Sequence, residues 1–168
     1  MFRELRRAKQ LLPKEAAEEI LRNATSGVLA VCGDDGYPYA VPVSFLYADG
    51  KIYFHGAKAG HKLDAIRRND KVSFCVIEQD EVIPETFSTD FRSVIAFGHA
   101  RELTDDAEKL RAIRMLAEKY SPELKEKAEE EIKSGWNALC MVEIQVEHLT
   151  GKESRELALS RAKQNDAT

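Results

Sequence analysis

The amino-acid sequence predicts a mainly β protein with some α structure, in which an antiparallel sheet of about six strands closes into a barrel with peripheral helices. Three observations lead to this fold class. Short apolar runs recur along the chain with turn residues between them, as is typical of antiparallel strands. Asp35-Gly36 and Asp49-Gly50 have the composition of tight hairpin turns. Few helical patterns separate the early strands, so the crossover connections of a parallel sheet are not expected.

The first part of the chain is expected to contain one helix and then strands. A proline in the first turn and an apolar stripe at helical spacing predict a helix over residues 13–24. The strands expected next cover residues 26–33, 37–48 and 52–54. Pro38 and Pro42 fall in the second of these strands. Because proline cannot donate to a sheet ladder, both should lie at an edge, a bulge or a ligand-facing interruption.

The segment after residue 54 has the composition of an anion-binding loop. It combines small residues with cations, namely Gly56, Ala57, Ala59 and Gly60 with Lys58, His61 and Lys62. An amphipathic helix then begins near Leu63. Small residues let the backbone approach a ligand, and exposed amides at a helix start favour an anion. The segment is therefore predicted to cradle a phosphate, although it has neither the P-loop pattern nor the G-x-G-x-x-G pattern of a dinucleotide fold.

The second half of the chain is expected to contribute three more strands. They should cover residues 71–78, 91–103 and 138–149, with a bulge or close contact at Gly98. A polar, proline-containing loop is expected over residues 79–90.

Two helices and a tail complete the predicted organisation. Thr104 is expected to cap a helix whose core face is formed by Leu110, Ile113, Leu116, Ala117 and Tyr120. A highly charged surface helix over residues 122–134 should end at Gly135. The polar residues 150–168 are expected to be partly disordered or to lie across a partner.

Length, composition and charge describe one ordinary globular domain. A chain of 168 residues with 43% hydrophobic and 32% charged residues is expected to form a single domain over residues 1–168, with the barrel over about 13–155 and a polar tail over about 156–168. The net charge, 25 − 29 = −4, does not favour a nucleic-acid binder. Because the sequence contains neither a bilayer-spanning apolar run nor the apolar centre of a secretory signal, a cytoplasmic protein without membrane contact is expected.

The cysteine pattern gives no indication of a metal. Cys32, Cys75 and Cys140 each lie in an apolar, strand-like run and are far apart in sequence. Since no Cys-x-x-Cys pair is present, no metal site is expected, and the thiols should be buried and reduced.

The ordered set of segments resembles the flavin-binding split barrel of the pyridoxamine 5′-phosphate oxidase superfamily, and most closely its 5-nitroimidazole-resistance (Nim-type) branch. The segments that carry the resemblance are, in family order, GYP at 36–38, VPVSF at 41–45, IYFHG at 52–56, GHKL at 60–63, FRSVI at 91–95 with FG at 97–98, and HLTGK at 148–152. The resemblance covers nearly the whole chain, from about residue 15 to 155. The resemblance implies an antiparallel, six-stranded, Greek-key-type split barrel.

The resemblance also implies a homodimer that binds FMN in two equivalent clefts at the subunit interface. Val41, Pro42, Val43 and Ser44 would lie along the flavin ring, while His55, Gly56 and Ala57 would line its ribityl and phosphate end. His61 and Lys62 would hold the phosphate, and Arg92, Ser93 and Trp136 would approach from the partner chain. Other roles stay open at several positions: Lys62 as a solvated helix lysine, His61 as a helix cap, and Trp136 as a packing residue.

By the same resemblance, the expected activity is that of an FMN-dependent oxidoreductase. Electrons would pass from NAD(P)H or another donor to a small electron-poor acceptor, either a nitro compound or a quinone, and no catalytic residue is identified. The chain has no basic cluster near its end to grip pyridoxal phosphate, so vitamin B6 oxidation is not expected. One alternative is a non-catalytic protein that stores or senses flavin or haem, and another is a flavin-free interaction protein.

Overall fold

The computed structural model describes residues 2–165 of the chain and shows a single seven-stranded antiparallel sheet. Its strands are β1 (Ser26–Cys32), β2 (Pro38–Ser44), β3 (Leu46–Ala48), β4 (Lys51–Ala57), β5 (Lys71–Ile83), β6 (Ser88–Glu102) and β7 (Leu139–Glu153). The α-helices are α1 (Lys14–Asn23), α2 (His61–Arg68), α3 (Asp106–Tyr120), α4 (Lys125–Gly135) and α5 (Arg155–Asn165). The strand order across the sheet is β2-β1-β5-β6-β7-β4-β3.

The two edges of this sheet are joined by a single residue, Phe45. Ser44 at the end of β2 pairs with Ser26 of β1, whereas Leu46 at the start of β3 pairs with Tyr53 of β4. The sheet therefore curls until its edge strands meet at Phe45 without forming a ladder with each other. We call this junction the seam. The split-barrel prediction is confirmed, with seven strands instead of six because the expected strand over residues 37–48 is broken at Phe45.

The main hydrophobic core lies inside the curled sheet. The largest fully buried side chains include Phe45, Phe54 and Phe74, and α1 adds Leu21 from one end. A second, smaller core lies between the sheet and the helix pair α3–α4, where Tyr53 and Met141 pack against Ala112, Ile113 and Leu116. The expected surface position of α4 is confirmed, since none of its residues is buried.

The β5–β6 hairpin continues beyond the barrel and forms an arm. The polar loop predicted over residues 79–90 is wrong, because β5 runs to Ile83, a 3₁₀ turn follows at Pro84–Thr86, and β6 begins at Ser88. Both faces of this ribbon are largely solvent-exposed, which explains why a polar sequence can form strands here. The bulge predicted at Gly98 is confirmed by a register shift between Phe97 and Gly98.

Two predictions about helix ends and the tail are corrected by the structure. Asp105, not Thr104, caps α3, because its side chain accepts hydrogen bonds from the amides of Ala107 and Glu108 at 3.0 and 2.9 Å. The expected tail begins as the end of β7 and continues as α5, with residues 166–168 outside the described part. Ser154 caps α5 through the Leu157 amide, which supplies the helix start that the polar composition did not reveal.

The cysteine prediction holds only in part. Cys140 is buried and Cys75 is half-buried, but Cys32 is exposed because it ends β1 on the outward side opposite Pro38. Within residues 2–165, no cluster of three His, Cys, Asp or Glu side chains is placed to hold a metal ion. In the same part of the chain, no helix has the length and apolar character needed to cross a membrane.

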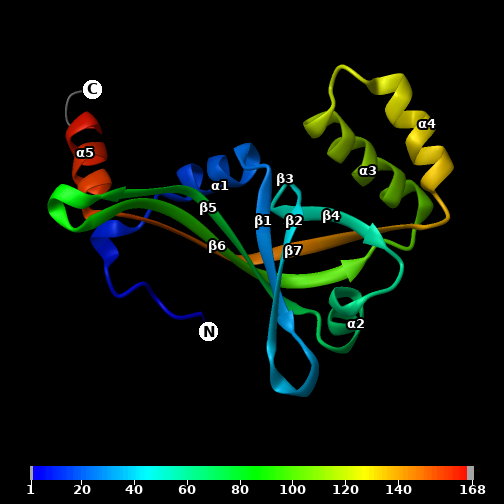
Figure 1. Cartoon of the computed structure of the whole chain (residues 1–168), viewed down its shortest axis with the longest axis horizontal. Coiled ribbons are helices and arrows are strands. Elements are labelled where there is room, and N and C mark those ends of the chain that lie inside the picture. Colours follow the sequence, from blue (N-terminus) through cyan, green and yellow to red (C-terminus); the bar gives the residue numbers. More distant parts are fainter. Residues whose placement is uncertain (1, 166–168) are drawn as a thin grey trace.

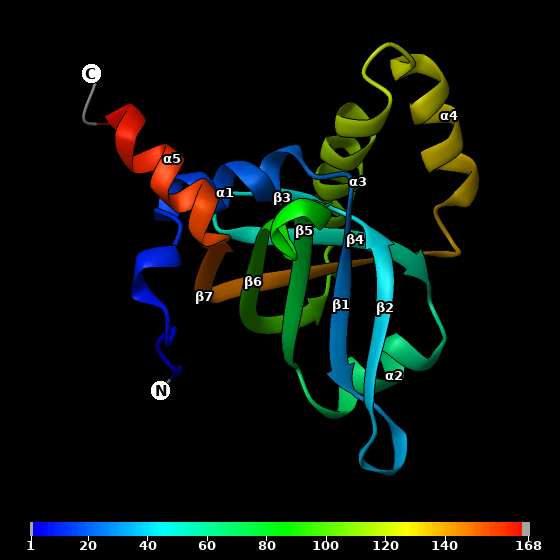
Figure 2. The same cartoon turned by 60° about the vertical axis from the view of Figure 1, so that its left-hand side comes forward.

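Helices gather at the two ends of the molecule. At one end α3 and α4 stand above the end of β4, with α2 on the other side of that strand (Figure 1). At the other end α5 lies beside the tip of the β5–β6 arm, and both views show this separation (Figure 2). We refer to these as the cleft end and the arm end.

Candidate functional site

A cleft of about 870 Å³ separates the end of β4 from the helix pair α3–α4. The sheet side of the cleft is formed by Ser44, His55, Gly56, Ala57, Ala138 and Leu139. The helix side is largely apolar and includes Ile113, Leu116, Ala117, Tyr120, Leu124, Ala128 and Ile132. Lys127 and Glu131 are the charged lining residues, and both are exposed on α4. A cavity of this size and lining suits a mainly apolar ligand oriented by a few polar groups.

Lys62 is not one of the lining residues of this cleft, but it reaches the end of β4 from α2 and lies against Gly56, which does line it. A Cβ atom added to Gly56 would lie 3.3 Å from Lys62 Cε and 3.5 Å from its Nζ, so the missing side chain at Gly56 leaves room for the lysine. Partial burial of the His55 ring, and secondly the charge of Lys62, lower the pKa of His55 below 6.5. Lys62 takes part in none of the ion pairs found among the described residues. Its charge is therefore available to an anion.

The start of α2 adds backbone donors near Lys62. Gly60 precedes the helix with φ 132°, a conformation that favours glycine, and no side chain caps this end. His61, the first helical residue, turns toward the β1–β2 connection, where its ring stacks on Tyr39 at 4.1 Å between centroids and its Nε2 lies 3.4 Å from Asp34 Oδ2. The contacts of the His61 side chain thus differ from those of its neighbour Lys62.

The predicted flavin-lining residues of β2 alternate between two faces. Val41 and Val43 are half-buried and pack against the barrel core, whereas Pro42 and Ser44 are exposed. Ser44 lines the cleft, and β2 is an edge strand. The prediction that Pro38 and Pro42 lie at an edge is confirmed. Only the main chain of Val41 and Val43 is left to contact a ligand beside the sheet.

Three of the predicted cofactor residues lie away from the cleft of their own chain. Arg92 lines a second cavity at the arm end, where its Nη1 donates to Glu78 at 3.1 Å. Ser93 lies in β6 opposite Ile77 and Lys152. Trp136 packs beside the smaller core, with Lys109 Nζ 4.1 Å from its ring centroid. The structure of one chain therefore brings together Ser44, His55, Gly56, Ala57 and Lys62, but not Arg92, Ser93 or Trp136.

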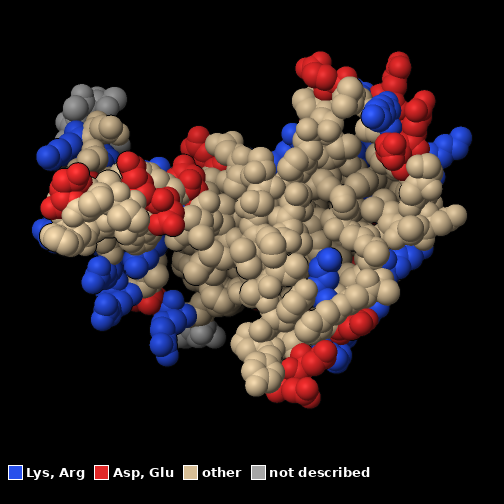
Figure 3. Space-filling view, in the orientation of Figure 1, with Lys and Arg blue, Asp and Glu red and all other residues tan. Residues whose placement is uncertain are grey.

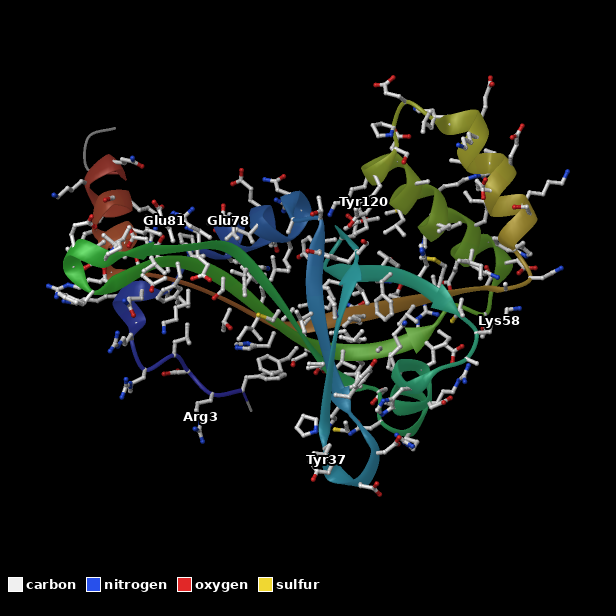
Figure 4. The ribbon with its side chains drawn as sticks, viewed as in Figure 1. Arg3, Tyr37, Lys58, Glu78, Glu81 and Tyr120 are labelled. Atoms are coloured by element: carbon white, nitrogen blue, oxygen red, sulfur yellow. The ribbon has the colours of Figure 1, made fainter. Side chains whose placement is uncertain are left out.

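The helix side of the cleft was not predicted as part of the site. The helical spacing predicts a core face of α3 that includes Ile113, Leu116, Ala117 and Tyr120. That spacing predicts the helix, but it does not show that this face lines a cleft. Tyr120 lies at the end of α3 beside the barrel, and Lys58 lies beyond the end of β4 (Figure 4). No local signal shows that residues 113–139 return to the strand ending at Ala57, because that proximity depends on the whole fold.

The open antiparallel barrel, with its edge strands meeting at the seam, places this protein in the class of split-barrel proteins. The chain belongs to the pyridoxamine 5′-phosphate oxidase family, because the model described as Pyridoxamine 5′-phosphate oxidase matches residues 13–153. This confirms the superfamily predicted from the sequence. No curated protein matches the chain.

Solved structures with the same fold include three that cover most of the chain. A candidate 5-nitroimidazole antibiotic resistance protein from Bacteroides thetaiotaomicron is 21% identical, with TM-score 0.70 and coverage of 85% of this chain and 86% of that one. A conserved hypothetical protein from Mycobacterium tuberculosis is 20% identical, with TM-score 0.78 and 92% coverage of both chains. An FAD and haem binding protein from Mycobacterium smegmatis is 20% identical, with TM-score 0.74 and coverage of 88% and 74%. At these identities the likenesses establish the fold.

Proposed function

We propose that this protein is a homodimeric, FMN-binding oxidoreductase that passes electrons from NAD(P)H or another donor to a small electron-poor acceptor, either a nitro compound or a quinone. The observation that carries the proposal is that Lys62, which forms no ion pair among the described residues, lies against Gly56, a residue that lines the apolar cleft of about 870 Å³. Family membership and the FAD and haem binding neighbour support a flavin.

The residues present fit a flavin mononucleotide. Its phosphate carries close to two negative charges at neutral pH and needs cations and amide donors, which Lys62 and the uncapped start of α2 supply. A flat ring fits between the apolar side chains of α3 and α4 and the small residues Gly56 and Ala57. When bound, the flavin supplies the redox chemistry, and the protein binds it, orients it and limits access of water.

The outward face of the sheet supports the proposed dimer. Residues directly opposite each other share a face, and two neighbouring rows cross five strands without any Asp, Glu, Lys or Arg side chain. One row is Pro42, Val28, Cys75, Ile95 and Thr150, and the other is Ala40, Ala30, Ser73, Phe97 and His148. In the space-filling view, lysine, arginine and acidic side chains lie around the margin of the visible face and leave its middle with few charges (Figure 3).

This uncharged face reaches the cleft. Pro42 ends one of the two rows and lies two residues before Ser44, which lines the cleft. A second copy packed on the rows would therefore stand beside the Ser44 edge, where residues of the partner subunit can complete the flavin site. Replacing Ile95 by lysine should convert the dimer to monomers in sedimentation velocity, whereas the same change at Val82 on the arm should not. An unchanged dimer in Ile95→Lys would place the interface elsewhere.

The visible spectrum of the purified protein is the main test of the proposed cofactor. We expect flavin absorption, or its appearance on titration with FMN, and tighter binding of FMN than of FAD. Bound flavin should be reduced by NADH or NADPH and reoxidised by a nitro compound or a quinone. No flavin binding would refute the proposal. Bound flavin that is never reduced would favour a storage or sensor protein, and a Soret band would favour haem.

A further inference from the structure

The seam of the open barrel is closed by side chains from α3. Phe45 is fully buried, and because it lies between β2 and β3 its N–H and C=O have no partner in either ladder. The Phe45 amide donates to the Tyr120 hydroxyl oxygen at 2.9 Å. Lys119 Nζ donates to the Phe45 carbonyl at 3.0 Å and to the Ala24 carbonyl at 2.5 Å. Consecutive residues of α3 thus satisfy both main-chain groups of the seam residue.

The same two side chains join the seam to the chain entering β1. The Tyr120 hydroxyl contacts the carbonyl of Thr25, directly before β1, and lies 3.0 Å from the carbonyl of Phe45. Its single proton serves one of these carbonyls at a time. The entry to β1 and the exit from β2 are consequently held to one point on α3. We call Lys119 and Tyr120 the seam clamp.

Among the described residues, Lys119 is bound by carbonyl groups and not by a carboxylate. Its Nζ lies 4.6 Å from the Phe45 ring centroid and 5.6 Å from that of Tyr120, and it forms none of the ion pairs found among residues 2–165. Burial lowers the pKa of Lys119 below its usual value of 10.5. An ordinary surface lysine stays solvated. The half-buried Lys119 instead contacts carbonyls and aromatic rings of the seam, so its position is specific to this junction.

The clamp is continuous with the cleft. Ser44, directly before the seam, and Tyr120, directly after Lys119, both line it. The position of the seam relative to α3 therefore sets the distance between the sheet side and the helix side of the cleft. We propose that Lys119 and Tyr120 are positioning residues for the flavin site, which fix the width of the cleft by clamping the barrel seam to α3. The proposal rests on the proposed flavin binding.

The test uses two clamp variants of the full chain. Tyr120→Phe keeps the ring and removes the hydroxyl, and Lys119→Met keeps much of the side-chain length and removes the donor. Tyr37→Phe is the matched control, since Tyr37 is 77% exposed at the β1–β2 turn. For each protein, the FMN dissociation constant, the visible circular dichroism of the bound flavin and the thermal midpoint without FMN are measured.

We expect both clamp variants to bind FMN roughly three- to tenfold more weakly, about the effect of one lost hydrogen bond on an equilibrium, and to give an altered visible dichroism. The control should match the native protein. A lower thermal midpoint with unchanged affinity and dichroism would show that the clamp is only structural and would overturn the proposal. Tyr120→Phe carries the test alone if Lys119→Met does not fold. Failure of the native protein to bind FMN would instead refute the proposed function, which keeps the two outcomes distinct.

Discussion

Charged side chains near the cavities at the two ends of the molecule differ in whether they form ion pairs. At the arm end, a cavity of about 690 Å³ lies among α1, α5 and the sheet, and four of its charged lining residues, Glu78, Arg92, Glu153 and Arg161, form ion pairs with one another. Glu153 is fully buried there and accepts from Arg161 Nε at 2.8 Å, with Arg92 Nε 3.5 Å away. At the cleft end, Lys62 has no such partner among the described residues. The paired charges at the arm end lie inside the fold, where removing one partner would leave the other uncompensated, whereas Lys62 is left for the phosphate that we propose.

The largest effect predicted from this contrast is at the arm end. Replacing Glu153 by glutamine should lower the free energy of unfolding by about 3 kcal/mol, the lower end of the range for breaking a buried ion pair, because both arginines keep partial solvent contact. Urea unfolding measures the loss. Glu156→Gln, at an exposed position of α5, is the matched control. A loss below about 0.5 kcal/mol in Glu153→Gln would mean that the arm charges do not hold the fold together.

At the cleft end, the corresponding effect is on binding. Lys62→Ala should weaken FMN binding by about 1.5–3 kcal/mol, the value of a hydrogen bond to a charged group, and should leave the free energy of unfolding nearly unchanged. Isothermal titration and urea unfolding measure the two quantities. Lys14→Ala on the exposed side of α1 should alter neither. If FMN affinity is the same in Lys62→Ala and in the native protein, Lys62 does not bind the phosphate.

Helix caps at the two ends provide a smaller, matched comparison. Asp105 caps α3, whose second half lines the cleft, and Ser154 caps α5 at the arm end. Asp105→Ala and Ser154→Ala should each reduce stability by about 1 kcal/mol, the typical value of an N-cap. Only Asp105→Ala should also weaken FMN binding, because α3 forms one side of the cleft. Equal effects of the two variants on FMN affinity would contradict the assignment of function to the cleft end.

Features that depend on a few neighbouring residues were predictable from the sequence. The turn at Asp49-Gly50 has positive φ at both residues, 51° and 74°, as a tight hairpin requires, and Pro42 lies at a sheet edge. The family segments also identified Gly56 and Lys62, which the fold brings together. The turn and edge signals are local, because the backbone conformation of a turn and the missing N–H donor of a proline are properties of one or two residues.

Features that depend on distant partners were missed. Phe45 has the apolar, aromatic character of a strand residue, and only the pairing of Ser44 with β1 and of Leu46 with β4 makes it a break. The strands over residues 79–90 were missed because a ribbon exposed on both faces has no apolar alternation. Tyr120 was identified as a core residue, but its hydrogen bond to Phe45 joins positions 75 residues apart. Sequence periodicity carries no information about such contacts.

The smallest effect concerns the protonation of His55 at the mouth of the cleft. Because its pKa in the folded protein lies below 6.5, the unfolded state binds more protons, and the stability from neutral His55 is lost as the pH falls from 6.5 through the folded pKa. Lys62→Ala should raise this pKa only in part, since burial is the larger cause. Saturating FMN should also raise it, because a phosphate beside Lys62 opposes the lysine charge. Titration of the His55 ring by NMR, with and without FMN, measures both shifts, and a pKa unchanged by FMN would place the phosphate away from this pair.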